Sequence, residues 1–116
     1  MVRREVVLAA TREEVWAALT RSEELSAWFG ADVEIDPRPR GAVTAREADG
    51  SVRRGTVVAA NAPWRLVVAW EPEPGGAEGS HVEFTLDDVV GGVRLTVIER
   101  PLTPGESGRF LQAAVR

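Results

Sequence analysis

The chain has 116 residues, of which 44% are hydrophobic and 28% charged, as is typical of one soluble globular domain. Its net charge of −4 and pI near 5.0 argue against nucleic-acid binding, which needs a basic surface. The absence of cysteine excludes disulfides, thiolate catalysis and cysteine-ligated metal sites.

No apolar run approaches the roughly 20 residues that a membrane-spanning helix needs, so we expect no membrane insertion. The chain begins MVRREVVLAA, where Glu5 interrupts the basic start and the apolar run is too short for a signal peptide. We therefore expect a cytoplasmic protein that forms a single domain over residues 1–116.

The first elements along the chain are a strand and a helix. Residues 2–9 are β-branched and apolar toward their end, which favours a strand. The motif T-R-E-E follows and predicts a capping box, in which the Thr11 hydroxyl accepts from the Glu14 amide and the Glu14 carboxylate reaches back. This helix should run to about Leu19, with Trp16 and Leu19 on its buried face.

A second short helix is predicted directly after the first. Ser22 is its expected cap, and Leu25, Trp28 and Phe29 form one apolar face at i, i+3 and i+4. Such a stripe is typical of core packing. We expect Trp28 and Phe29 to reach a pocket as well, because they lie where the helix meets the next strand.

After Gly30 the hydrophobic pattern changes to a period of two, which is typical of strands buried on one face. Six strands are predicted in succession, at residues 32–36, 42–47, 52–60, 65–70, 81–87 and 93–99. Asp49-Gly50 favours a type I′ hairpin, and Gly91-Gly92 a second tight turn. Such short connections require an antiparallel meander, because parallel neighbours need long crossovers.

The end of the chain predicts a third helix. Thr103 and Glu106 form a second capping box, with Pro104 at the first helical position. This helix is the element left to cover the half-buried sheet. The predicted fold class is therefore α+β, a curved antiparallel sheet with two short helices after the first strand and a C-terminal helix on the sheet.

This order of elements resembles the helix-grip fold of the START-like (SRPBCC) superfamily. The chain is similar to bacterial members of the family named after the activator of the 90-kDa heat-shock protein ATPase. The matching stretches are ATREEVWAAL (10–19), SAWFG (26–30), IDPRPRG (35–41), DG (49–50), PWRL (63–66), VAW (68–70) and GGVRLTV (91–97). Gly41-Ala42 replaces the paired glycines that are usual in the family, and the last helix is short.

The resemblance implies an apolar cavity between the sheet and the C-terminal helix, and an apolar or amphipathic metabolite as its ligand. The inward residues expected to line it are Trp28, Phe29, Val33, Ile35, Val43, Trp70, Phe84, Leu86, Leu95, Val97 and Phe110. Trp70 is the strongest of these candidates, because an indole offers a flat apolar face and one donor. Trp64 follows Pro63 in a turn and is expected to cover the end of a hairpin.

Two other functions are compatible with the same resemblance. One is a co-chaperone that binds a heat-shock protein through its surface. The other is an enzyme like the polyketide cyclases of the superfamily, which would need an inward ionisable group, for which Glu47, Glu99 and Arg46 are the candidates. No catalytic signature, cofactor motif or metal-ligand cluster is present in the sequence, so we expect neither cofactor nor metal.

The remaining charged residues are interpreted as surface groups. His81 alternates with the apolar face of its strand and is expected in solvent. The acidic row of Asp32, Glu34 and Asp36 is expected to pair with arginines of a neighbouring strand. The arginine pairs at 38/40 and 53/54 are expected to be surface charge as well.

The shortness of the last helix leads to a prediction about assembly. From Thr103 it would be about 20 Å long at 1.5 Å per residue, too short to cover six strands. The uncovered apolar surface should meet a partner, so we expect a homodimer that joins the open sides of two sheets; the alternative is a natural C-terminal helix that continues beyond Arg116.

Overall fold

The computed structural model describes residues 2–72 and 79–101, and for residues 28 and 29 only the backbone. In chain order these residues form β1 (Val2–Leu8), α1 (Arg12–Thr20), α2 (Ser22–Phe29), β2 (Asp32–Ile35), β3 (Ala42–Arg46), β4 (Val52–Asn61), β5 (Arg65–Trp70), β6 (Ser80–Val89) and β7 (Gly92–Pro101). The predicted order of elements is confirmed over this part of the chain, with small differences at their ends.

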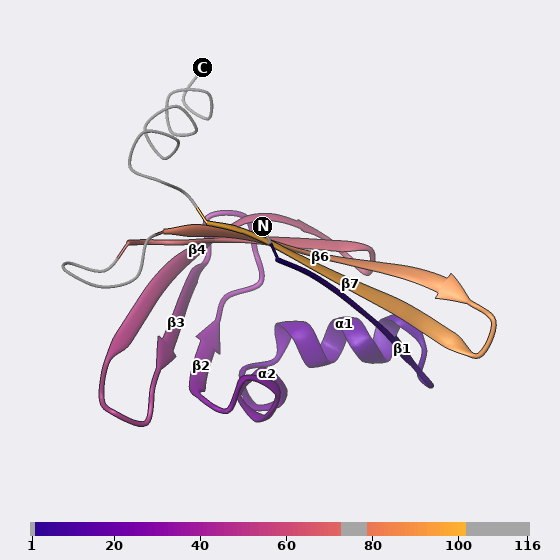
Figure 1. Cartoon of the computed structure of the whole chain (residues 1–116), viewed down its shortest axis with the longest axis horizontal. Helices are drawn as coiled ribbons and strands as arrows, with labels where there is room; N and C mark the ends of the chain where they lie inside the picture. The colour runs from indigo at the N-terminus through magenta and orange to yellow at the C-terminus, as the bar shows by residue number, and fades with distance from the viewer. Residues whose placement is uncertain (1, 73–78, 102–116) are drawn as a thin grey trace, which may run out of the picture.

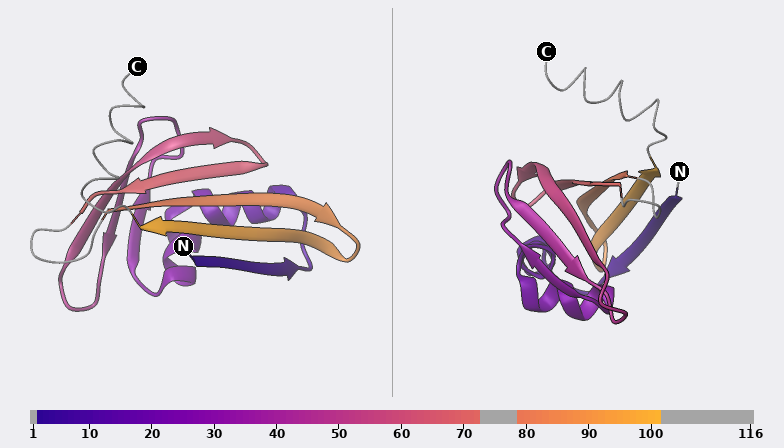
Figure 2. Two further views of the ribbon diagram at one scale, coloured as in Figure 1. Left: turned by 45° about the horizontal axis from the view of Figure 1, so that its top comes forward. Right: turned by 90° about the vertical axis from the view of Figure 1, so that its left-hand side faces the viewer.

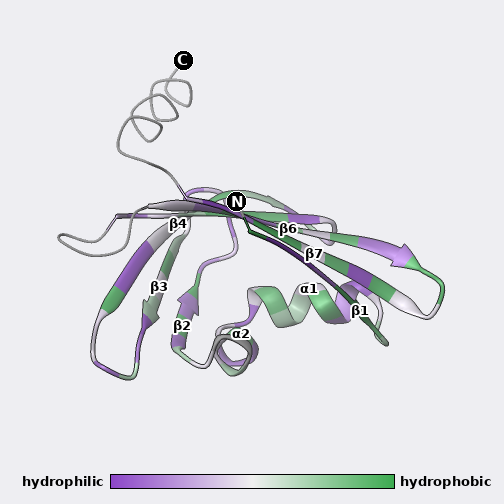
Figure 3. Ribbon diagram, viewed as in Figure 1, coloured by the Kyte–Doolittle hydropathy of each residue, from purple (hydrophilic) through white to green (hydrophobic). Residues whose placement is uncertain are grey.

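The strands form one antiparallel sheet in the order β1-β7-β6-β5-β4-β3-β2. The predicted meander is therefore confirmed for β2 to β7, and β1 returns to pair with β7, where Val2 lies opposite Glu99. The sheet is strongly curved, and α1 and α2 lie on its concave side (Figures 1 and 2). Hydrophobic and hydrophilic residues alternate along its strands, as expected where one face is buried (Figure 3).

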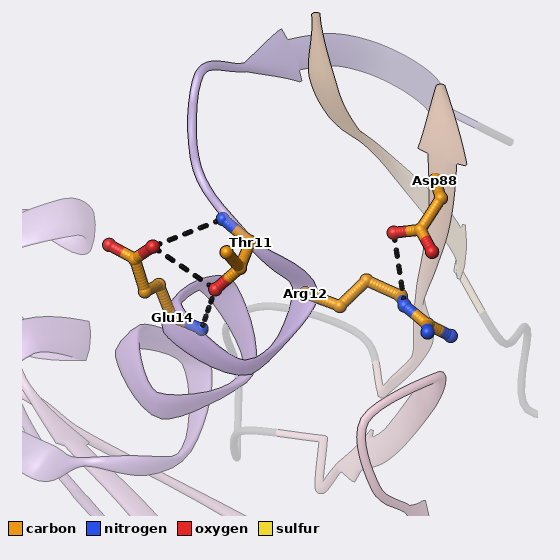
Figure 4. A network of polar contacts seen from close by, with 4 residues as sticks. All are labelled: Thr11, Arg12, Glu14 and Asp88. Atoms are coloured by element: carbon orange, nitrogen blue, oxygen red, sulfur yellow. Dashed lines mark hydrogen bonds and ion pairs between the residues drawn. The ribbon is translucent and has the colours of Figure 1, made fainter. Parts of the chain in front are cut away.

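The start of α1 is fixed by two sets of polar contacts (Figure 4). The predicted capping box is confirmed: the Glu14 amide donates to Thr11 Oγ1 at 3.1 Å, and the Thr11 amide donates to Glu14 Oε1 at 3.2 Å. Arg12 Nε forms an ion pair with Asp88 Oδ1 on β6 at 3.0 Å, and its guanidinium stacks 3.4 Å from the ring centroid of Trp64. The helix is thereby joined to β6 and to the β4–β5 turn.

The buried face of α1 differs by one position from the prediction. Val15 and Leu19 are the buried residues of this helix, whereas Trp16 is half-buried and packs against the margin of the core. Val15 and Leu19 are four residues apart and thus lie on one stripe. The large Trp16 ring is placed beside that stripe, so the prediction that it lies in the core is only partly correct.

The predicted Ser22 cap is wrong. Ser22 is the first helical residue of α2, and the preceding Arg21 makes no side-chain cap. Instead Ser22 Oγ accepts the Ile35 amide at 3.1 Å, and Ser26 Oγ accepts the Val33 amide at 2.8 Å. The two serines, one turn apart, thus hold β2 against the helix.

The core lies between the concave face and the two helices. Its buried residues are Val15, Leu19, Leu25, Val33, Val43, Ala45, Val57, Leu66, Val68, Val82, Phe84, Leu86, Val93 and Leu95. Both helices and six of the strands contribute to it, so burial of this one surface holds the described fold together.

Two predicted details of the loops are corrected. In the 47–50 turn only Gly50 has a positive φ, of 90°, whereas a type I′ turn needs positive φ at both central residues. The turn closes instead through the Gly50 amide, which donates to the Glu47 carbonyl at 3.0 Å. Asp36 pairs with Arg38 two residues along, not with a neighbouring strand, and this hydrogen bond lowers the pKa of Asp36.

The C-terminal helix predicted from Thr103 lies outside the described residues. The homodimer expected from its shortness therefore stays a prediction. Among the residues that the structure describes, no helix is long and apolar enough to cross a membrane.

His81 lies on the outer face of the sheet as predicted, but it is half-buried there and not fully in solvent. Burial lowers its pKa from the ordinary value of 6.5, and Arg100 and Arg65 lower it further against the opposing effect of Glu83. The imidazole is therefore a weaker base in the folded chain than in the unfolded chain.

Replacing Leu19 by alanine should destabilise the protein by about 2–5 kcal/mol, the usual cost of emptying a buried leucine site. Leu19 is fully buried, whereas Val90 is fully exposed, so Val90→Ala serves as a control with little effect. Urea unfolding of the three proteins measures both free energies. An unchanged midpoint for Leu19→Ala would contradict the packing of α1 described above.

The lowered pKa of His81 predicts a loss of stability in acid. Because the unfolded chain binds the proton more tightly, the free energy of unfolding should fall as the pH drops below about 6.5 toward the lowered folded pKa. Urea titrations at pH 7.5 and 5.5 should show a smaller pH dependence in His81→Gln than in the parent. Equal pH dependence in the two proteins would mean that His81 titrates alike in the folded and unfolded states.

Candidate functional site

The concave face contains a pocket of about 290 Å³. Its described lining residues are Val2, Arg4, Leu19, Leu25, Ala31, Val33, Ile35, Ala45, Glu47, Arg53, Leu66, Val68, Trp70, Val82, Phe84, Val97 and Glu99. The two helices contribute Leu19 and Leu25, and the strands contribute most of the rest. Most of this surface is aliphatic or aromatic.

Strand register explains why these residues meet. One row of register partners crosses β5, β6, β7 and β1, and it carries Leu66, Phe84, Val97 and Arg4 in that order. The next row across the same strands carries Val68, Val82, Glu99 and Val2. Because side chains alternate between faces along a strand, both rows point into the curved side of the sheet.

Trp70 lies in a third row, between two small residues. Its register partner on β4 is Gly55 and its partner on β6 is Ser80. A Cβ atom at Gly55 would lie 2.9 Å from Cε3 of the indole and 2.7 Å from the Ala69 carbonyl oxygen. Glycine at this position therefore leaves the space in which the Trp70 ring packs against β4.

Four charged side chains also line the pocket: Arg4, Glu47, Arg53 and Glu99. Arg53 and Glu99 are half-buried, whereas Arg4 and Glu47 are exposed. Glu99 Oε2 accepts a 3.0 Å hydrogen bond from the hydroxyl of Ser80, which is itself buried. The Arg53 guanidinium lies 5.3 Å from the centroid of the Trp70 ring, within the range of a cation–π contact.

The residues that the sequence proposes for the cavity fall into three groups. Val33, Ile35, Trp70, Phe84 and Val97 line the pocket. Val43, Leu86 and Leu95 are buried in the core and are not among the lining residues. The side chains of Trp28 and Phe29, and all of Phe110, lie outside the described residues.

The ionisable candidates also separate. Glu47 and Glu99 line the pocket, where a polyketide-cyclase-like enzyme would need an ionisable group. Arg46 is exposed at the end of β3 and does not line this pocket. The sequence prediction that Arg53 and Arg54 are both surface charge is wrong for Arg53. Strand alternation was the available signal, since Arg53, Gly55 and Val57 share one face of β4 while Arg54 faces away.

Arg4 and several aliphatic lining residues were likewise missed. Arg4 shares its face of β1 with Val2 and could have been found from that alternation. Among the described residues no group of three or more potential ligands is placed to hold a metal ion.

The family described as "Activator of Hsp90 ATPase homolog 1-like protein" matches residues 9–113. The chain belongs to this family. Its curved sheet with two short helices after the first strand is the helix-grip fold of START-like domains, as the sequence predicted. The chain matches no curated protein.

Solved structures show the same fold. A Mesorhizobium loti protein superposes with a TM-score of 0.78 at 22% identity, over 97% of this chain and 84% of that one. A Rhodobacter sphaeroides protein is 29% identical, with a TM-score of 0.68 over 97% and 77% of the two chains. DynU16, from the dynemicin biosynthetic locus, superposes with a TM-score of 0.74 at 24% identity, over 97% of this chain and 42% of the DynU16 chain.

Gly55→Ala should displace the Trp70 ring and destabilise the protein by about 1–3 kcal/mol, the usual cost of overpacking. The indole N–H signals in NMR spectra report the ring, and urea unfolding reports the stability. Thr56→Ala, an exposed neighbour on β4, is the control. Unchanged indole signals and an unchanged midpoint in Gly55→Ala would contradict the close packing of Trp70 on Gly55.

Proposed function

We propose that this protein is a small-molecule-binding START-like domain whose ligand occupies the pocket on the concave face. The observation that carries the proposal is the combination of an aliphatic wall with two half-buried charged groups, Arg53 and Glu99. Ligand sites in proteins have this composition, because apolar area supplies affinity and a few polar groups fix orientation. The ligand is therefore an apolar or amphipathic metabolite.

The size of the pocket supports a small ligand. Its volume of about 290 Å³ is near the lower end of the roughly 300–1,000 Å³ typical of ligand sites. An apolar cavity of about 150 Å³ is enough to bind benzene. A body of about two fused rings is thus the size that the described walls accommodate.

Catalysis in the same pocket is the second candidate. It is favoured by one observation, the carboxylate of Glu99, which the buried Ser80 hydroxyl holds in the wall. A carboxylate fixed beside a bound substrate can act as a general base. DynU16, which has the same fold, comes from a biosynthetic locus. No comparable observation among the described residues favours a co-chaperone surface.

Filling the pocket should abolish binding. Ala45 is buried and lines the pocket, whereas Ala42 of the same strand is exposed and faces away. Ala45→Phe should weaken binding of a fluorescent apolar dye by at least about tenfold, since the new ring occupies the ligand's volume, and Ala42→Phe should not. Ala45→Leu is the substitute if the larger ring prevents folding.

Native mass spectrometry of the purified protein provides an independent test. A co-purified small molecule should be present on the parent and on Ala42→Phe, and absent from Ala45→Phe.

In the dye experiment, equal binding by the parent and Ala45→Phe would mean that the dye binds elsewhere, and it would overturn the proposed site.

A further inference from the structure

The arrangement of charge around Trp70 bears on the kind of ligand that the pocket accepts. Along the strands, the row that contains Gly55 and Trp70 lies between the row of Arg53 and the row of Glu99. A molecule lying against the indole would therefore have a cation toward one end and a carboxylate toward the other. The half-buried charges at the two ends therefore differ in sign, while the exposed Glu47 and Arg4 complete the charged part of the lining.

The indole is suited to a planar partner. Gly55 and Ser80, its register neighbours, are both small, so the side chains beside Trp70 leave its ring accessible from the pocket that it lines. Aromatic rings prefer offset-stacked or edge-to-face contact with one another, which adds to the gain from burial.

Arg53 is suited to an acidic group. A guanidinium is planar, weakly hydrated and carries five N–H donors, so it can stack beside an aromatic ring and still donate to a carboxylate. Its half-buried position strengthens such a bond, because less water screens it than at the surface. Glu99 repels the same acid from the opposite end, where it already accepts the Ser80 hydroxyl.

We infer that the pocket binds an aromatic acid of about two rings, with its ring against Trp70 and its carboxylate on Arg53. The inference rests on the proposed function and adds the chemical class of the ligand. It requires the charge of Arg53, whereas the proposed function requires only the apolar pocket.

Three probes with the same ring system test the inference: 2-naphthoate, 2-naphthol and 2-naphthylmethylammonium. Titration calorimetry on the full chain should show 2-naphthoate to bind the most tightly. Arg53→Gln should weaken 2-naphthoate about tenfold or more, because a hydrogen bond to a charged group contributes at least one decade in Kd. The same substitution should change the Kd of 2-naphthol by no more than about twofold, because 2-naphthol carries no carboxylate.

Arg54→Gln is the matched control, since Arg54 is the next residue of β4 and is exposed on the other face. It should change none of the three affinities. Arg53→Lys keeps the charge and should retain the preference for 2-naphthoate over 2-naphthol. It also provides a folded variant if Arg53→Gln does not fold, which thermal unfolding monitors.

The outcomes separate the two proposals. The inferred ligand class would be wrong if the ammonium probe bound more tightly than 2-naphthoate. It would also be wrong if 2-naphthoate and 2-naphthol bound equally and Arg53→Gln changed neither affinity. In both cases the proposal of an apolar binding pocket would remain valid. Failure of all three probes to bind, in a protein that still binds the apolar dye, would also overturn only the aromatic acid; failure of the dye to bind as well would overturn both proposals.

Discussion

The structure depends on the burial of one face of a continuous antiparallel sheet. Strands such as β3 and β6 alternate apolar and polar side chains, so most of the buried apolar residues gather on the concave side. Water must be excluded from that side for the sheet to be stable. Val15, Leu19 and Leu25 of the two short helices cover part of it. The pocket forms where the helices and the sheet meet without filling the space between them.

The helices are held by polar contacts as well as by packing. Arg12 connects the start of α1 to Asp88 and Trp64, and the serines of α2 bond to the backbone of β2. One set of contacts lies at the start of α1, and the other lies in the first half of α2. They hold both helices on the sheet, and Leu19 and Leu25 of those helices line the pocket.

Within the pocket, small residues decide where large ones lie. Gly55 lets the Trp70 ring pack against β4. Arg53 lies beside that ring because it is two residues before Gly55 on the same face of β4. On the other side Ser80 is both small and a donor, so it makes room for the indole and holds Glu99. Three neighbouring rows of the sheet thus bring together a cation, an aromatic surface and a carboxylate.

The order of elements, the antiparallel meander, the capping box of α1 and the family could all be predicted from the amino-acid sequence, because local patterns and short connections carry that information. It also indicated Val33, Ile35, Trp70, Phe84 and Val97 as inward residues. Packing of the folded chain was needed to place Arg53 in the pocket lining and Arg54 outside it, and to place Val43, Leu86 and Leu95 in the core. The same is true of Val15, which joins Leu19 in the core in place of Trp16. The physical reason is that alternation tells which face a side chain is on, whereas the curvature of the sheet and the position of the helices determine whether that part of the face is packed or left open.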